Sequence, residues 1–232
     1  MEPVNKKIPV YLEIGSKRTF AGAMDWPGWC RSGRDEESAL QSLVDCGARY
    51  ARVVRGREFK FRAPADAASL VVVERLKGNA TTDFGAPDLA PASDATPIKE
   101  AELKHLQAVL KACWRAFDAS VKSANGKELR KGPRGGGREL DGVVRHVLES
   151  DGSYLSSLGW RAAQDEGADI GEELKRLRKA ILEGLTAAAH GKIAERGPRG
   201  GHRWKPRYFV RRSTWHVLDH AWEIEDRVDD GG

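Results

Sequence analysis

From about residue 98 onward, the apolar residues of this chain recur at every third or fourth position, whereas before that point they alternate or form short runs. A spacing near 3.6 residues is typical of an amphipathic helix, and a helix that is apolar on one side has to bury that side against another element. Four such stripes follow one another over residues 98–232. Because four one-sided helices cover one another most simply side by side, we expect a four-helix bundle.

The four stripes differ in length but share the same spacing, and the first predicts a helix over about residues 98–123. Loops rich in glycine and arginine precede the second and the fourth. In chain order, the stripes consist of Leu103, Leu106, Leu110, Cys113, Trp114, Phe117 and Val121; Leu140, Val144, Val147, Leu148, Leu155 and Leu158; Leu174, Leu177, Ile181, Leu185 and Ala188; and Val210, Val217, Leu218, Ala221, Ile224 and Val228.

The first third of the chain shows the pattern of a small sheet. Residues 8–14 and 18–24 predict two strands joined by a tight turn, and a Pro-Gly turn then leads to a short strand around Cys30. One helix beginning near Asp35 and two further strands, at 57–61 and 69–76, complete the pattern. We therefore expect an α+β protein with an α/β domain at 1–77, a linker or surface arm at 78–97 and the bundle at 98–232.

Charge and cysteine content narrow the classes of function. With 39 basic and 34 acidic residues, the formal charge is +5, which favours small anionic ligands but lacks the basic stripe of a nucleic-acid-binding protein, so nucleic acid is an unlikely partner. No apolar run approaches the roughly 20 residues that cross a bilayer, so no membrane partner is expected. Three cysteines cannot all pair within one chain, which favours a cytoplasmic location. A homodimer is compatible with the sequence.

The last stripe contains WHVLDHAWE, in which His216 and His220 lie one helical turn apart. A helical projection puts His146 and His216 about 120° from the centres of their stripes, and His220 about 80°, all on the same side. Two imidazoles on one helix and a third on another can hold a divalent ion such as zinc, nickel, iron or copper and leave a position open for water. The alternative is that these histidines are surface or hydrogen-bonded residues beside tryptophans, because such spacings are common by chance.

Further candidate residues surround this triad in the sequence. The loops KGPRGGGREL and RGPRGGHRWK each deliver arginines next to a helix N-terminus, where anions bind, although two solvated connections would show the same composition. Glu149 and Glu223 are candidates for orienting the imidazoles, and Asp219 lies nearly opposite its stripe and ranks below Glu223. The candidate substrate-binding arginines are Arg134, Arg138, Arg199 and Arg203.

The segments RHVLESDGSYL and WHVLDHAWEIEDR, each within a predicted helix, make residues 98–229 similar to the DinB-like superfamily of four-helix-bundle metalloproteins. In that family a histidine of the second helix and a His-x-x-x-His pair of the fourth hold a divalent ion, with water completing its shell. The resemblance assigns these roles to His146, His216 and His220. It also implies thiol-dependent transferase or isomerase activity with mycothiol, bacillithiol or glutathione, as in the characterised members. The family's up-down-down-up order of helices needs the connection at 160–169 to travel the length of the bundle, and a short connection there would give a simple up-down-up-down bundle instead.

Residues 7–55 resemble the HicB-like fold, through a strand, the turn in DWPGW and a helix opening at GRDEESAL. HicB proteins are antitoxins that occlude a small RNA-cleaving partner, so this resemblance implies a protein partner recognised through residues such as Trp26 and Trp29. Two hypotheses follow. The chain is a metal-dependent enzyme, a small-thiol-dependent transferase or a hydrolase, or it is a non-catalytic binding or regulatory protein whose bundle is structural.

Overall fold

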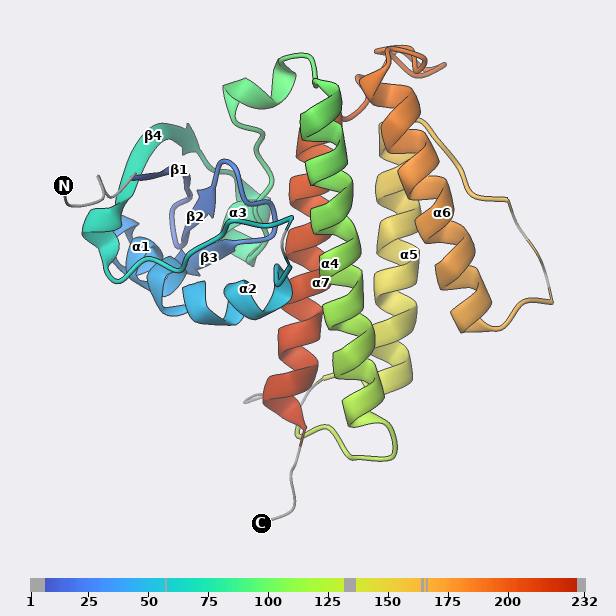
Figure 1. The fold of residues 1–232 in the computed structure, drawn as a ribbon, viewed down its shortest axis with the longest axis horizontal. Coiled ribbons are helices and arrows are strands. Elements are labelled where there is room, and N and C mark those ends of the chain that lie inside the picture. Colours follow the sequence, from blue (N-terminus) through green and yellow to red (C-terminus); the bar gives the residue numbers. More distant parts are fainter. Residues whose placement is uncertain (1–6, 57, 132–136, 164, 166, 229–232) are drawn as a thin grey trace. The chain divides into compact units, whose positions relative to one another are not determined.

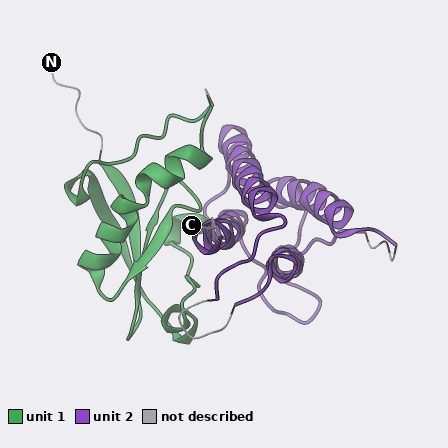
Figure 2. Ribbon diagram, turned by 90° about the horizontal axis from the view of Figure 1, so that it is seen from below, with its two compact units in different colours: residues 1–95 green, residues 96–232 purple. Residues whose placement is uncertain are grey.

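The computed structural model describes residues 7–56, 58–131, 137–163, 165 and 167–228. Figure 1 shows the elements along the chain, and Figure 2 colours the two compact units, residues 1–95 and 96–232. The first unit is built on a four-stranded sheet and the second from four long helices, so the expected α+β class is confirmed.

The sheet of the first unit is mixed. It consists of β1 (Ile8–Ile14), β2 (Thr19–Ala23), β3 (Cys30–Gly33) and β4 (Leu70–Lys77), in the order β3-β2-β1-β4. β1 pairs with β2 in antiparallel fashion, because a tight turn brings Gly15 N–H within 2.9 Å of the Arg18 carbonyl oxygen, and β1 pairs with β4 in parallel. A parallel partner needs a crossover connection, and two helices between β3 and β4 provide it.

Those helices are α1 (Glu36–Asp45) and α2 (Gly47–Val53). The apolar spacing of the sequence predicts a single helix in their place. α1 starts at a capping box in which the Asp35 carboxylate accepts from Ser38 N–H, 2.8 Å away. The helices meet at Cys46, which ends α1 and begins α2. The break turns the chain, so that α2 presents the buried Tyr50 ring to Trp29, 6.0 Å away between ring centroids.

The strand expected at 57–61 was a wrong prediction, because residues 58–63 form no strand. Their aromatic side chains cover the core instead of pairing with the sheet: the Phe61 ring lies 4.9 Å from Trp29 and 5.0 Å from Tyr50, both edge to face. Trp29 is fully buried and its indole N–H donates to the Leu43 carbonyl oxygen, 2.9 Å away. It is therefore a core residue that no partner protein can reach, whereas Trp26 is partly exposed.

The segment expected as a linker or arm contains α3 (Ala80–Phe84) and a short 3₁₀ helix (Ala92–Ala95), and both belong to the first unit. The fully buried carboxylate of Glu13 on β1 fixes this segment. It accepts the Thr82 hydroxyl at 2.5 Å, the Asp88 backbone N–H at 2.9 Å and the Leu89 backbone N–H at 3.0 Å. A buried carboxylate that accepts several hydrogen bonds is stable only while they remain in place, so the segment is bound to the sheet.

Glu13→Ala is therefore expected to lower the free energy of unfolding of the first unit by about 3 kcal/mol, because it leaves buried donors without an acceptor. Hydrogen exchange at residues 79–89 should accelerate in the same variant. The exposed Glu58→Ala is the control. Unchanged exchange in Glu13→Ala would mean that the carboxylate does not fix the segment.

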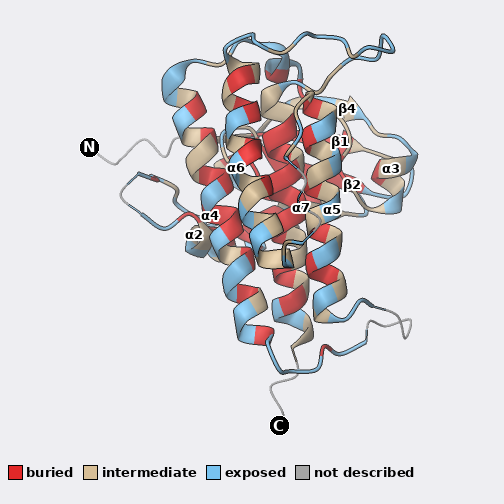
Figure 3. Ribbon diagram, turned by 90° about the vertical axis from the view of Figure 1, so that its right-hand side faces the viewer, coloured by how far each residue is buried: buried red, intermediate tan, exposed pale blue. Residues whose placement is uncertain are grey.

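The second unit consists of α4 (Glu100–Ala124), α5 (Leu140–Leu158), α6 (Ile170–Ala189) and α7 (Pro206–Arg227). α4 and α7 run parallel, because Arg207 donates to Glu102 at 2.7 Å near their starts and Ser120 donates to Glu225 at 2.9 Å near their ends. Figure 3 shows that buried residues occur along all four helices. Among the described residues, no helix combines the length and apolar character that a membrane crossing requires.

α5 and α6 also run parallel, since the side chains of Leu155 and Trp160 at the end of α5 lie against Gly184, near the end of α6. α6 is antiparallel to α4, where Gln107 donates to Thr186 at 2.9 Å. The order is thus up-down-down-up, and the connection from α5 to α6 has to travel back along the bundle. Eleven residues reach about 36 Å when extended, enough for the roughly 28 Å of α5. The loops before α5 and before α7 consequently lie at opposite ends of the bundle (Figure 1).

Candidate metal centre

Three histidines meet between α5 and α7 in the second unit. His146 extends from α5, and His216 and His220 extend from successive turns of α7. Their ring centroids are 5.1 Å (His146 to His216), 4.9 Å (His146 to His220) and 4.6 Å (His216 to His220) apart. One nitrogen from each ring lies within 4.8 Å of the other two. The three residues that the helical projection puts on matching sides are therefore brought together in space.

The distances between the nitrogens fit a common ion. Nε2 of His216 lies 3.2 Å from Nε2 of His146. Two imidazole nitrogens that bind one tetrahedral zinc ion, each about 2.0–2.1 Å from the metal, are about 3.3 Å apart. The donor set is three borderline imidazoles, which suits zinc, nickel or iron.

Glu223 orients one ligand of the triad. Nδ1 of His220 lies 2.7 Å from Oε2 of Glu223, and Arg227 Nη1 donates to the other carboxylate oxygen at 2.7 Å. The hydrogen bond from His220, followed by the one from Arg227, lowers the pKa of Glu223, so the carboxylate is ionised and accepts the Nδ1 proton. With a proton on Nδ1, Nε2 is the nitrogen of His220 that can bind a metal. This carboxylate–imidazole pairing is typical of metal-binding histidines.

The interior of the site favours neutral imidazoles. Burial lowers the pKa of His216 to about 2, with smaller contributions from the charges of His220, His146, Arg212 and Arg138. Burial is also the main cause that lowers the pKa of His146. Both rings therefore offer a lone pair at neutral pH, the form that binds metal. Nδ1 of His216 is buried without a hydrogen-bond partner among the described residues.

The other candidate residues lie at different distances from the triad. Arg138 is near it: its charge acts on both His146 and His216, and its backbone carbonyl accepts from Arg227 at 3.0 Å. Glu149 is exposed and acts on His146 through its charge. Arg199 and Arg203 lie in the loop before α7, at the end of the bundle opposite to the loop that contains Arg138. Arg199 is on an exposed turn, and Arg203 lies against Gly159 at the end of α5. Arg134 lies outside the described residues.

Two residues near His216 were missed from the sequence. They are Arg212, one turn before His216 on α7, and Tyr154 of α5, whose ring lies 5.6 Å from His216 between centroids. Trp204 lies against Tyr154, and Tyr208 lies against Trp204. The helical spacing contains a signal for both missed residues. Arg212, His216 and His220 are four residues apart, and Tyr154 is two turns beyond His146. The signal is weak, because nothing in the sequence distinguishes a single arginine within a helix from the many arginines of a solvated surface.

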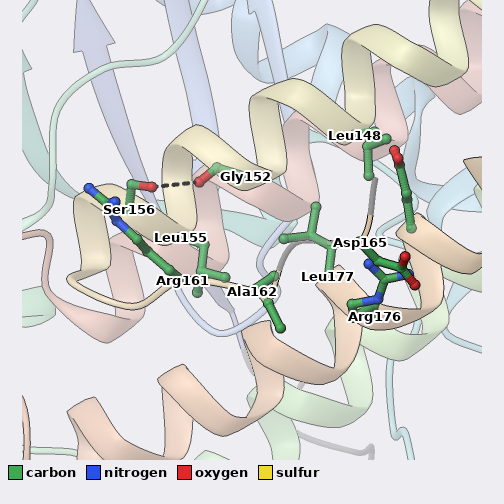
Figure 4. A pocket seen from close by; sticks show the side chains of 11 residues that line it. Leu148, Gly152, Leu155, Ser156, Arg161, Ala162, Asp165, Arg176 and Leu177 are labelled. Atoms are coloured by element: carbon green, nitrogen blue, oxygen red, sulfur yellow. Dashed lines mark hydrogen bonds and ion pairs between the residues drawn. The ribbon is translucent and has the colours of Figure 1, made fainter. Parts of the chain in front are cut away.

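A separate cavity of about 580 Å³ lies on another side of α5, between α5, α6 and their connection (Figure 4). Its lining combines apolar side chains with the ion pair of Arg176 and Asp165, whose nitrogen and oxygen are 3.2 Å apart. Leu148 and Leu155, which are expected in the core stripe, line it. None of the three histidines is among the described residues that line this cavity.

Glu223→Gln is expected to weaken zinc binding by about 10-fold to 100-fold, because an amide holds the His220 tautomer less firmly than a carboxylate. Isothermal titration of the metal-free protein with zinc measures the change. Glu149→Gln, on the neighbouring helix, is the matched control, with an expected change of less than about 3-fold because this exposed residue affects His146 by its charge alone. Equal losses in both variants would argue against the orienting role of Glu223.

Comparisons of the chain with models of protein families, with curated proteins and with solved structures found no match.

Proposed function

We propose that the second unit is the catalytic part of a metal-dependent enzyme, in which His146, His216 and His220 hold one divalent ion. The observation that carries the proposal is the convergence of three imidazole nitrogens within 4.8 Å, two of them on rings with lowered pKa values. Three imidazoles that converge in this way have little purpose as a set of hydrogen bonds, because each ring can serve only one donor and one acceptor. A cation would satisfy all three.

A divalent ion held by three histidines keeps open positions, and when bound it lowers the pKa of a coordinated water or thiol, which provides a nucleophile at neutral pH. The chain's own residues serve that chemistry. Glu223 fixes the His220 ring, and Arg227 fixes Glu223 while also donating to the Arg130 and Arg138 carbonyl oxygens. The positive charge of Arg138 lies near the triad and would attract an anionic substrate. Zinc, nickel or iron is the ion, and a low-molecular-weight thiol or water is the nucleophile.

The reaction class is a transfer to a small thiol or a hydrolysis. The test is a transfer assay with the zinc-loaded and nickel-loaded protein, electrophilic substrates, and glutathione, bacillithiol or mycothiol as the thiol. Turnover that needs both metal and thiol supports the transferase. Metal-dependent turnover without thiol dependence supports the hydrolase and rejects the thiol version. Absence of bound metal rejects the enzyme proposal as a whole.

A second candidate function, recognition of a protein partner, concerns the first unit alone. β4 is at the edge of the sheet, and its Val71 and Val73 side chains are 39% and 54% exposed. Phe84 of α3 is 90% exposed. Exposed apolar residues beside an open strand edge favour pairing with another chain. Affinity purification of the full chain, with Val73→Lys as the comparison, tests this function: one specific protein should be retained by the unmodified chain and lost in the variant.

A further inference from the structure

The cavity between α5, α6 and their connection is elongated, and its two ends differ (Figure 4). On α5 its lining runs from Leu148 to Ser156, which corresponds to a rise of about 12 Å along the helix. Arg161 lies beside Ser156 at one end, and Arg176 lies with Asp165 at the other. The volume of about 580 Å³ is in the range of sites that hold small organic molecules.

The middle of the cavity is apolar. Leu155 of α5 and Leu177 of α6 are buried residues that line it, and Ala162 of the connection also lies between the two ends. A wall of this kind stabilises a bound molecule through each CH₂ group that it removes from water. The middle of the cavity therefore favours a hydrocarbon chain.

Gly152 keeps the α5 wall of the cavity open. It lies inside the helix, where glycine is less favourable than alanine because it loses more backbone entropy on folding. Packing does not require a glycine here, because a Cβ at this position would meet no atom of the described residues within 4 Å. The space in front of Gly152 is thus free, and a side chain placed there would narrow the cavity without a steric conflict.

The two ends of the cavity carry opposite charges. Arg161 makes no hydrogen bond or ion pair with another described residue, so its end has a net charge of +1. At the other end, Arg176 Nη2 lies 3.2 Å from Oδ2 of Asp165. Glu173, one turn before Arg176 on α6, also lines the cavity, and its carboxylate has no partner in the part of the chain that the structure describes. One arginine and two carboxylates give this end a net charge of −1.

This distribution of charge selects between classes of ligand. A fatty acid would pair with Arg161 but would leave the Glu173 carboxylate without a cation. An alkyl amine would pair with Glu173 and leave Arg161 without an anion. A molecule with a negative charge at one end and a positive charge at the other satisfies both residues at once.

We propose that this cavity binds a linear small molecule that is anionic at one end, apolar in the middle and cationic at the other, as a long-chain ω-amino carboxylate is. The carboxylate accepts two hydrogen bonds from the Arg161 guanidinium, the chain lies against Leu155 and Leu177, and the ammonium donates to Glu173. With C–C bonds of about 1.5 Å, a chain of about eight carbons spans most of the length between the ends. The site does not rest on the proposed function, because its described lining contains none of the metal-binding histidines. Binding involves no covalent step.

The probe that tests the site is 8-aminooctanoate, titrated by calorimetry into the metal-free full chain and, separately, into the zinc-loaded chain. Octanoate lacks the ammonium group, and octylamine lacks the carboxylate. We expect 8-aminooctanoate to bind in both forms of the protein. Octanoate and octylamine should each bind about 3-fold to 10-fold more weakly, because each loses one partly solvated ion pair.

Two charge variants test the orientation of the ligand. Arg161→Gln should weaken the binding of 8-aminooctanoate and octanoate by about 3-fold to 10-fold and leave octylamine binding unchanged. Glu173→Gln should weaken the binding of 8-aminooctanoate and octylamine to the same extent and leave octanoate binding unchanged. Glu172→Gln is the matched control, because Glu172 is exposed and is not among the described lining residues. It should bind all three compounds as the unmodified chain does.

Gly152→Leu tests the location of the site. Its side chain occupies the middle of the cavity, so 8-aminooctanoate binding should fall by more than about 10-fold while the zinc content stays the same. Ser153→Leu is the matched control, because Ser153 is the exposed neighbour on α5 and is not among the described lining residues. Circular dichroism establishes that each variant is folded.

Four outcomes would overturn the site: no binding of 8-aminooctanoate to the unmodified chain, equally tight binding of octanoate or octylamine, undiminished binding by folded Gly152→Leu, or equal losses in Glu173→Gln and Glu172→Gln. If Gly152→Leu does not fold, the crossed pattern of Arg161→Gln and Glu173→Gln decides. A chain that binds no zinc contradicts the proposed function alone, because binding of 8-aminooctanoate is also measured without metal.

Discussion

Replacement of His216 by alanine is expected to reduce the zinc content of the purified protein from about one ion per chain to background. Two imidazoles remain in this variant, and loss of a direct ligand costs more than the 10-fold to 100-fold penalty that follows loss of an orienting partner. His216 is also the most buried of the three histidines, with 7% of its surface exposed. Water from the solvent therefore does not easily take its place as a metal ligand. Elemental analysis after dialysis measures the content.

His190→Ala is the matched control for this experiment. His190 follows the last residue of α6, where its Nε2 lies 2.6 Å from Oε1 of Glu100, so it is a helix-end residue away from the triad. Its replacement should leave the zinc content unchanged. Retention of a full equivalent of zinc by a folded His216→Ala protein would show that the triad is not the binding site.

The second large effect concerns Asp151, which occupies a core position of α5 and is 2% exposed. The positive charge of Arg178 acts on Asp151, but the two terminal nitrogens of Arg178 donate to the Asp118 carboxylate at 2.8 and 2.7 Å. Oδ1 of Asp151 and Nε of Arg178 are both buried with no hydrogen-bond partner among the described residues. Burial therefore outweighs the attraction of Arg178 and raises the pKa of Asp151 to about 7.

The consequence for stability follows from the direction of this shift. The folded protein holds the Asp151 proton up to about pH 7, whereas the unfolded chain releases it near its ordinary pKa of 3.8. The contribution to stability is thus fully present below about pH 4 and is lost as the pH rises through about 7. A difference of about three pKa units between the folded and unfolded states changes the free energy of unfolding by at most about 4 kcal/mol.

Asp151→Asn should therefore be more stable than the unmodified protein at about pH 8, by at most about 4 kcal/mol, and this advantage should shrink towards about pH 5. Urea unfolding of the metal-free protein, followed by far-ultraviolet circular dichroism, gives the difference at each pH. The exposed Asp141→Asn on the same helix is the control. A stability difference between Asp151→Asn and the unmodified protein that does not vary with pH would contradict the burial of an unpaired carboxyl group.

Helical spacing puts the three histidines on matching sides of their stripes, and the family resemblance adds the expectation that they meet. His216 and His220 share a face because they are four residues apart, and His146 lies at the corresponding position of an antiparallel neighbour. The lengths of the four helices also follow from their apolar stripes. Such predictions succeed because each depends on spacing within one continuous helix.

Features that depend on long-range packing are not accessible in this way. The aromatic residues at 59–61 have strand-like spacing, and only the position of Trp29 and Tyr50 explains why Phe61 covers the core instead. α5 and α6 run parallel, whereas a short connection between two helices favours an antiparallel pair. The spacing gives only a weak signal for Arg212, because its contact with the Tyr154 ring joins two different helices.

The central claim is that His146, His216 and His220 bind one divalent ion, and titration of the metal-free protein with Co²⁺ tests it most directly. Cobalt occupies zinc sites, and its visible absorption reports the number and the type of its ligands. We expect the spectrum to saturate at one equivalent per chain with the bands of a four-coordinate or five-coordinate site rich in nitrogen ligands. Absorption that does not saturate, or that matches hydrated Co²⁺ at every ratio, would contradict the claim.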